Sequence, residues 1–198
     1  VAYGYFYTDY ACETCRTTDG APVAVPATAE TCKPIRIGDD IDIRVGNVAV
    51  APDGAVYMTV VERPDSKLRS ALWKLDGGDW QEIVLGQYLD APYDTVAGAV
   101  VSVSQGGTVY VVAAAGTLDW GGPAQEIFLL VSKDGGKTFA TQRIGPRDPK
   151  LANWLPNIER NMGHAPVDLP HFIFTHGDPG EKNDAPAATD IRFVALGR

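Results

Sequence analysis

The chain has 198 residues and a formal net charge of −8, with 45% hydrophobic and 21% charged residues. This composition is ordinary for a globular protein, and the length is enough to bury a sizeable core. The acidic balance supplies no basic stripe, which argues against nucleic acid and anionic membrane as partners. No apolar run reaches the roughly 18 residues of a membrane span.

The first residues, VAYGYFYTDY, read as the middle of a strand. They lack Met, and they lack the basic n-region and small cleavage-site residues of a signal peptide. We therefore expect the printed sequence to begin at an internal residue. We predict that residues 1–18 form the outer half of a four-stranded unit.

Four β-hairpins are predicted after this start, each joining two runs rich in Val, Ile, Tyr or Phe. Their turns are Asp53-Gly54, Asp76-Gly77-Gly78, Gly106-Gly107 and Asp134-Gly135-Gly136. Asp-Gly and Gly-Gly turns accept the positive φ angles of tight hairpins. The turns recur about every 25 residues, so pairs of hairpins recur about every 50, the period expected of four-stranded propeller blades.

The predicted fold is therefore all-β, built from β-propeller blades of four antiparallel strands. Complete blades are expected at 46–85 and 97–144, with a last blade at 156–196 that ends in TDIRFVAL. We divide the chain into segments 1–45, 46–96, 97–150 and 151–198, about three and a half blades, whereas a ring closes with roughly four to eight. We expect the C-terminal part of one propeller domain, completed by the same protein or by a partner chain. The alternative is a self-contained β-sandwich.

The stretch VSKDGGKTF, residues 131–139, lies at the fourth turn. We expect Asp134 to accept hydrogen bonds from backbone N–H groups of its own turn, and Gly136 to take the left-handed conformation. The stretch resembles the Asp-box repeat of neuraminidase-type propellers, Ser-x-Asp-x-Gly-x-Thr-Trp/Phe, with Phe139 at the last position. In that family the box is an outer turn away from the active site, so the resemblance implies a structural role.

Longer segments resemble the BNR-repeat proteins that include ulvan-degrading polysaccharide lyases. They are YGYFYTDY followed by RTTDGAPVAVPAT, then NVAVAPDGAVYMTVVE and ALWKLDGGDWQEIVL. The Trp usual before Asp-Gly in that family is missing from Arg16-Thr17-Thr18-Asp19-Gly20. The resemblance implies a carbohydrate-active propeller, without deciding between lyase and glycosidase. We expect a secreted or periplasmic enzyme that degrades an acidic, uronate-containing polysaccharide by β-elimination, and the resemblance to ulvan lyases implies that its main catalytic residues lie in earlier blades.

Two other functions stay open at this stage. A sialidase-type glycoside hydrolase would require an arginine triad and a Tyr/Glu nucleophile pair, which the sequence does not display. A non-catalytic carbohydrate-binding propeller needs no such residues. Fold alone does not decide among the three functions.

Cys12, Cys15 and Cys32 are clustered near the start of the chain. Two thiolates spaced as Cys12 and Cys15 can hold one metal ion, and Cys32 would supply a third ligand of a tetrahedral structural zinc site. Asp9 or one of the three histidines is a candidate for the fourth ligand. The alternatives are a disulfide plus one free thiol, or three unrelated free thiols.

The segment NWLPNIERNMGHAPVDLPHFIFTHGDPGEKND, residues 153–184, is the least repetitive, and we expect it to link the last two blades. His164 is a candidate proton acceptor or donor. Arg160 is a candidate catalytic group and a fork for a carboxylate or sulfate. Glu159 and Asp168 are candidate substrate ligands, while His171 opens an apolar run and is expected to be structural. The alternative is an ordinary loop in which Arg160 pairs with Glu159 and His164 caps a turn.

Asp39, Asp40 and Asp42 crowd the stretch GDDIDIR, which ends at Arg44. Calcium is a possible ligand there, although the spacing fits no EF-hand loop. A solvated acidic entry to the next blade is the simpler interpretation.

Overall fold

The computed structural model describes residues 2–4, 6–8, 14–17, 19–24, 28, 34–37, 43–63, 68–116, 122, 124–145, 148–160, 167–178 and 188–197. These residues form antiparallel β-sheets joined by turns and one short 3-10 helix, η2 (Leu85–Tyr88). The predicted all-β class is confirmed. No helix in the described part of the chain is long and apolar enough to cross a membrane.

Two sheets are complete four-stranded meanders. The first contains β6 (Ile43–Val50), β7 (Val56–Glu62), β8 (Arg69–Asp76) and β9 (Asp79–Val84), and the second β10 (Val96–Val103), β11 (Val109–Ala115), β12 (Glu126–Ser132) and β13 (Ala140–Ile144). Gly54, Gly77, Gly107 and Gly135 take positive φ in the turns between paired strands, as the sequence predicted. Each sheet uses consecutive strands only, unlike a β-sandwich, where Greek-key connections pass between two sheets.

A third sheet holds β14 (Ala152–Ile158), β15 (Phe172–Asp178) and β16 (Ala188–Val194) in that order. The expectation that residues 153–184 form a linker is therefore wrong, because the segment contains two of these strands. The sequence does not indicate β14, because Pro156 lies within it and proline is depleted from strand interiors. The structure accommodates Pro156 at a register shift between Trp154 and Asn157, next to Leu155 with a φ of 51°. The last sheet accordingly begins at Ala152, not at residue 156.

The N-terminal strands form two smaller sheets. β1 (Ala2–Gly4) pairs with β5 (Pro34–Ile37), while β2 (Phe6–Thr8), β3 (Cys15–Thr17) and β4 (Pro22–Val23) make a three-stranded sheet. Residues 1–18 do contain a hairpin, β2–β3, but β1 joins a different sheet. The expectation that 1–18 is half of one four-stranded unit is therefore only partly correct.

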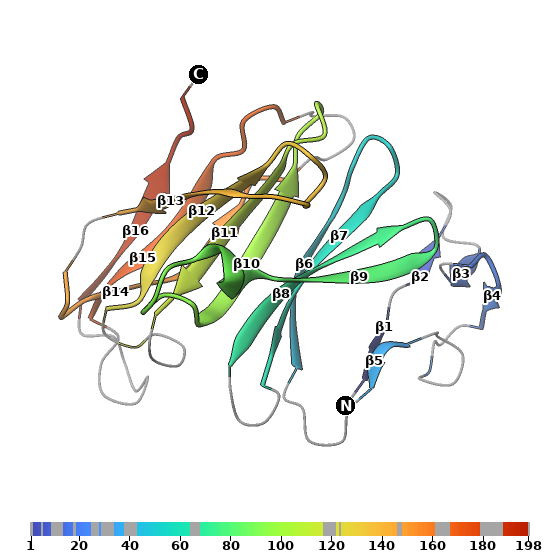
Figure 1. Ribbon diagram of the computed structural model, residues 1–198, viewed down its shortest axis with the longest axis horizontal. Coiled ribbons are helices and arrows are strands. Elements are labelled where there is room, and N and C mark those ends of the chain that lie inside the picture. Colours follow the sequence, from blue (N-terminus) through green and yellow to red (C-terminus); the bar gives the residue numbers. More distant parts are fainter. Residues whose placement is uncertain are drawn as a thin grey trace.

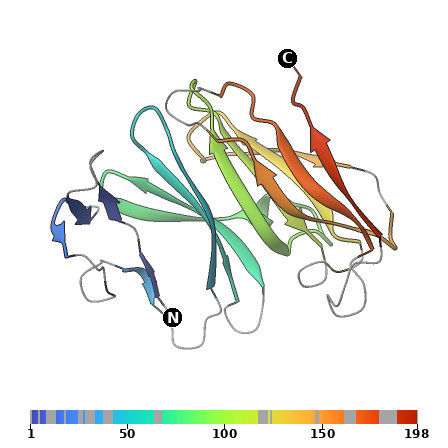
Figure 2. The ribbon, with the colours of Figure 1, turned by 180° about the vertical axis from the view of Figure 1, so that it is seen from behind.

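The three larger sheets lie side by side in chain order (Figures 1 and 2). One core cluster lies between the first and second sheets and includes Leu72, Val101, Val111 and Leu130. Another lies between the second and third sheets and includes Val112, Ile127, Phe172 and Phe174. Burial of this apolar area is the main force that holds the sheets together.

A bulge in β6 provides a polar link between the first two sheets. The β6–β7 register shifts between Val45 and Val48. Asn47 lies in this shift and binds the backbone of Val101 in β10. Its Nδ2 donates to the Val101 carbonyl at 2.8 Å, and its Oδ1 accepts from the Val101 N–H at 2.7 Å. At the edge of β10, the Asn47 side chain therefore makes the two hydrogen bonds to Val101 that a neighbouring strand would otherwise make.

The Asp134 turn has the hydrogen bonds that the sequence predicted. One carboxylate oxygen of Asp134 accepts from the N–H groups of Lys137 (3.1 Å) and Thr138 (3.0 Å), and the other accepts from the Thr138 hydroxyl (2.6 Å). The Ser132 hydroxyl donates to Asp134 at 2.7 Å and accepts from the Gly136 N–H at 2.8 Å. This network involves only residues of the turn itself, and the Tyr57 hydroxyl of β7 adds a hydrogen bond to the Gly135 carbonyl at 3.2 Å.

We predict that Asp134→Asn lowers the thermal unfolding midpoint at neutral pH. Hydrogen bonds from Thr138, followed by the one from Ser132, hold the pKa of the Asp134 carboxyl below its ordinary value of 3.8. Because the folded-state pKa is the lower one, the stabilisation is complete above pH 3.8 and is lost as pH falls through the folded-state value. The difference in midpoint between variant and wild type, followed by circular dichroism, should narrow below that pH. A difference independent of pH would contradict this assignment.

Candidate functional site

Three of the predicted polar residues after β14, Glu159, Arg160 and Asp168, are exposed, and no hydrogen bond or ion pair joins their side chains to one another. Glu159 and Arg160 directly follow β14, and Asp168 lies in the connection to β15. The Glu159 carboxylate accepts from the His171 N–H at 3.2 Å. The alternative Glu159–Arg160 pair is absent from the ion pairs of the described residues. Among the described residues Arg160 has no ion-pair partner. His164 lies outside the described residues, so its role and that of Arg160 stay predictions.

Asp168 lies beside the turn of the second sheet. The Tyr110 hydroxyl donates to the Asp168 carbonyl at 3.4 Å, and the Gln105 N–H donates to the Val167 carbonyl at 3.0 Å. The Asp168 backbone therefore helps to attach the β14–β15 connection to the second sheet. Nothing in this geometry tests its predicted role as a substrate ligand.

His176 belongs to a buried polar chain between the second and third sheets. Its Nδ1 is 2.8 Å from Oδ1 of Asn153, and Nδ2 of Asn153 donates to Glu126 at 3.3 Å. All three residues are buried. A histidine that is hydrogen-bonded inside a sheet interface is well placed for a structural role.

The proposed metal sites fall largely outside the described residues. Cys15 begins β3 as a half-buried free thiol, whereas Cys12 and Cys32 are not among the described residues. The same holds for Asp39, Asp40 and Asp42. The described part of the chain contains no cluster of three or more potential metal ligands. Zinc and calcium therefore both stay predictions.

We predict one zinc ion per chain, held by Cys12, Cys15 and Cys32. Elemental analysis of protein purified without chelator should give a 1:1 ratio, and titration of the denatured, chelated protein should find all 3 thiols free. Cys15→Ser should lower the zinc content. Absence of zinc together with a single free thiol would instead establish the disulfide alternative.

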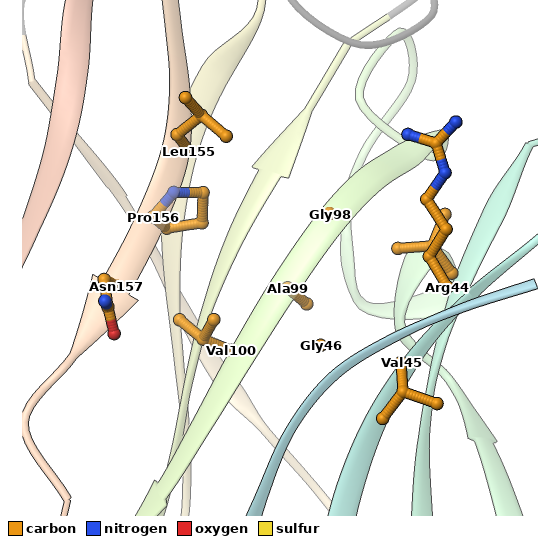
Figure 3. Close-up of a pocket in the computed structure, with 10 residues that line it drawn as sticks. Arg44, Val45, Gly46, Gly98, Ala99, Val100, Leu155, Pro156 and Asn157 are labelled. Carbon is orange, nitrogen blue, oxygen red and sulfur yellow. The ribbon is translucent and has the colours of Figure 1, made fainter.

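A pocket of about 410 Å³ lies where the first strands of the three larger sheets face one another. Its wall is formed by residues 44–46 of β6, residue 61 of β7, residues 98–100 of β10 and residues 155–157 of β14. Arg44 and Leu155–Pro156 lie on opposite sides of β10 (Figure 3). Most of the wall is apolar, and Arg44 is the one charged residue among the described residues that line it. Concave apolar sites with few polar groups are typical ligand-binding sites.

Close packing of β6 on its neighbours brings Arg44 to this pocket. A Cβ atom at Gly46 would come within 2.6 Å of the Ala99 carbonyl oxygen, so only glycine allows this approach. Asn47 fixes the same segment to Val101. The bulge therefore fixes the part of β6 from which Arg44 projects.

Arg44 can bind an anion in this position. Its guanidinium has five N–H donors in a planar fork that matches a carboxylate or sulfate. Arg44 also has an interaction partner within the protein. Asn157, exposed on the opposite wall, adds an amide that can bind hydroxyl groups.

Sequence reasoning missed this site. The sequence analysis gives Arg44 no role beyond the end of an acidic stretch, and it places Asn157 in the expected linker without a role. The available signal was Gly46-Asn47 within a strand-like run, since an interior glycine often marks a bulge or a close backbone approach.

No protein-family model matches the sequence, and no curated protein matches it. Solved structures do match. One is described as a polysaccharide lyase, a PL25 ulvan lyase, with a TM-score of 0.64 and 12% identity over 96% of this chain. Another is that lyase bound to -[GlcA(1-4)Rha3S]-, with a TM-score of 0.63 and 12% identity over the same share. The chain shares its fold with these lyases. It spans 41% of their length.

Proposed function

We propose that this protein is carbohydrate-active and binds an acidic, uronate-containing polysaccharide in the pocket between β6, β10 and β14. The observation that carries the proposal is Arg44, a guanidinium on an otherwise mainly apolar wall. The fold shared with ulvan lyase structures supports the same class of ligand. We further propose that the sheets belong to one propeller of which residues 1–198 are a part.

The proposed contact pairs Arg44 with the carboxylate of a uronate residue. An acidic protein repels an acidic polymer at long range, so binding needs a local cation that faces the ligand. Arg44 is exposed, so its guanidinium is accessible to a ligand that arrives from solution. Asn157 would bind a hydroxyl group of the same or the next sugar.

The reaction that this contact favours is β-elimination. A base removes the proton at C5 of the uronate, the C4–O bond breaks, and the departing oxygen takes up a proton, which leaves a C4=C5 double bond. Arg44 would stabilise the negative charge that develops on the carboxylate as the C5 proton leaves. The described residues that line the pocket include no histidine, tyrosine or carboxylate. His164 stays our candidate for the proton-transfer group.

Incubation with a uronate polysaccharide distinguishes the three candidate functions. Elimination produces an unsaturated sugar that absorbs ultraviolet light. New reducing ends without that absorbance would instead indicate a glycoside hydrolase. Binding without either product would indicate a carbohydrate-binding protein and would contradict the proposed lyase reaction.

A further inference from the structure

The third sheet lies at one end of the row of larger sheets, and its two faces differ (Figure 1). Phe172 and Phe174 of β15 are each 2% exposed and belong to the cluster shared with the second sheet. Successive side chains of a strand point to opposite faces, so Ile173 lies on the other face. Among the described residues of that face, Ile173 is 38% exposed, Ile191 74% and Phe193 65%.

The last strand, β16, has its large apolar side chains on this open face. Phe193 lies opposite Ile173 in the β15–β16 register, and Ile191 is two positions away on the same face. Asp190 and Arg192 lie on the other face, where they form an exposed ion pair at 3.1 Å. A strand with one face in water normally has its polar residues on that face. The pattern of β16 is therefore that of a strand whose open face is covered.

The first two sheets have corresponding apolar side chains on their second and third strands, and there the next sheet covers them. In the second sheet, Val112 of β11 lies opposite Leu129 of β12, and both pack against the third sheet. In the first sheet, Leu72 of β8 packs against the second sheet. Ile173 and Phe193 are the corresponding opposed pair of the third sheet. The third sheet thus repeats a contact surface that the other two sheets use.

The shape of the open face also suits an opposing sheet. Ile173 and Phe193 line a hollow of about 370 Å³ on this face. Side chains of packed sheets interdigitate, so a hollow between apolar residues can accept an apolar side chain from the opposing sheet. Contiguous exposed apolar side chains on a sheet are typical of an interaction surface.

We propose that the open face of the third sheet is an interface, and that it packs against a further β-sheet of the same protein formed by residues outside 1–198. The ulvan lyase structures support such residues, since this chain spans 41% of their length. The contacting side of that sheet would be apolar, like the side of the third sheet that contains Phe172 and Phe174. The inference rests on the proposed propeller, but not on the ligand proposed for the Arg44 pocket.

Hydroxyl-radical footprinting of the natural full-length protein tests whether the face is covered, because it measures the solvent access of each side chain. Phe172 is the matched reference, as a buried phenylalanine in the adjacent strand. A covered Phe193 should react within about twofold of the rate of Phe172. A rate more than about tenfold higher would show an open ring and would overturn the proposal.

Thermal unfolding of the same protein gives an independent readout. Phe193→Ser should lower the unfolding midpoint by at least about 5 °C, because the loss of a buried ring leaves a cavity. Arg192→Ser is the matched control on the other face of β16, in an exposed ion pair, and should shift the midpoint by no more than about 1 °C. Equal midpoints of the two variants would contradict a covered Phe193.

A photo-reactive p-benzoylphenylalanine in place of Phe193 identifies the occupant. Irradiation should link it to a peptide from outside residues 1–198 of the same molecule, with a yield independent of protein concentration. The same group in place of Arg192 should not link to that peptide. A cross-linked pair of chains would mean that a second copy covers the face and would overturn the assigned occupant. A link within residues 1–198 of one molecule would overturn it as well.

These results separate failure of this inference from failure of the proposed polysaccharide. If Phe193 is open while a glucuronate oligosaccharide binds in an Arg44-dependent way, the interface is wrong and the ligand stands. If Phe193 is covered by the same molecule and the oligosaccharide does not bind, the interface stands and the ligand is wrong. An open Phe193 together with no binding would overturn both.

Discussion

Arg44→Ala is expected to weaken binding of a uronate oligosaccharide about 10- to 100-fold, the loss typical of a hydrogen bond to a charged group. In the part of the chain that the structure describes, Arg44 is the one charged residue lining the pocket between β6, β10 and β14, so no described neighbour in that wall can replace its charge. Arg44→Lys should give an intermediate affinity, because lysine keeps the charge but loses the planar fork. Calorimetric titration of each variant measures the change.

Arg143→Ala is the matched control for Arg44. Arg143 is exposed on β13 and does not line the pocket. Its replacement by alanine changes the net charge of the protein by the same amount as Arg44→Ala. If Arg143→Ala weakened binding as much as Arg44→Ala, the effect would be one of overall charge, and the assignment of the pocket would be wrong.

The largest effect on stability is expected for Asn47→Leu, about 2 to 4 kcal/mol less stable than wild type. Leucine cannot bind the Val101 N–H and carbonyl, which Asn47 contacts at 2.7 and 2.8 Å. Val101 is buried, so both backbone groups would lose their partner at a sheet interface. Urea unfolding measures the difference in free energy.

Gln81→Leu is the control for Asn47→Leu, because it removes an amide from the exposed strand β9. It should change the free energy of unfolding by no more than about 0.5 kcal/mol. Equal stability of Asn47→Leu and wild type would mean that water replaces the amide. Asn47 would then contribute nothing to the stability of the contact between the first two sheets.

The parts of the fold that depend on local chemistry could be predicted from the sequence. Asp53-Gly54 and Asp134-Gly135-Gly136 specify tight turns by themselves, because few residues other than glycine accept positive φ. The hydrogen bonds of Asp134 also involve only residues of its own turn. A four-stranded repeat followed from the spacing of such turns.

The parts that depend on contacts between distant strands could not be predicted. The sequence predicts a linker in place of β14, because Pro156 and the polar residues around it are unusual in a strand. Pairing with β15 shows that a register shift accommodates the proline. Arg44, Gly98 and Asn157 come from three sheets and are more than 50 positions apart in the chain. Nothing in their local sequence indicates that they share a pocket.

The central claim is that the pocket recognises the carboxylate of a uronate. The most direct test compares binding of a glucuronate oligosaccharide with binding of the same oligosaccharide after reduction of its carboxyl groups to alcohols. We predict that reduction weakens binding to wild type about as much as Arg44→Ala does, and that it has little further effect in that variant. Equal binding of both oligosaccharides to wild type would contradict the claim.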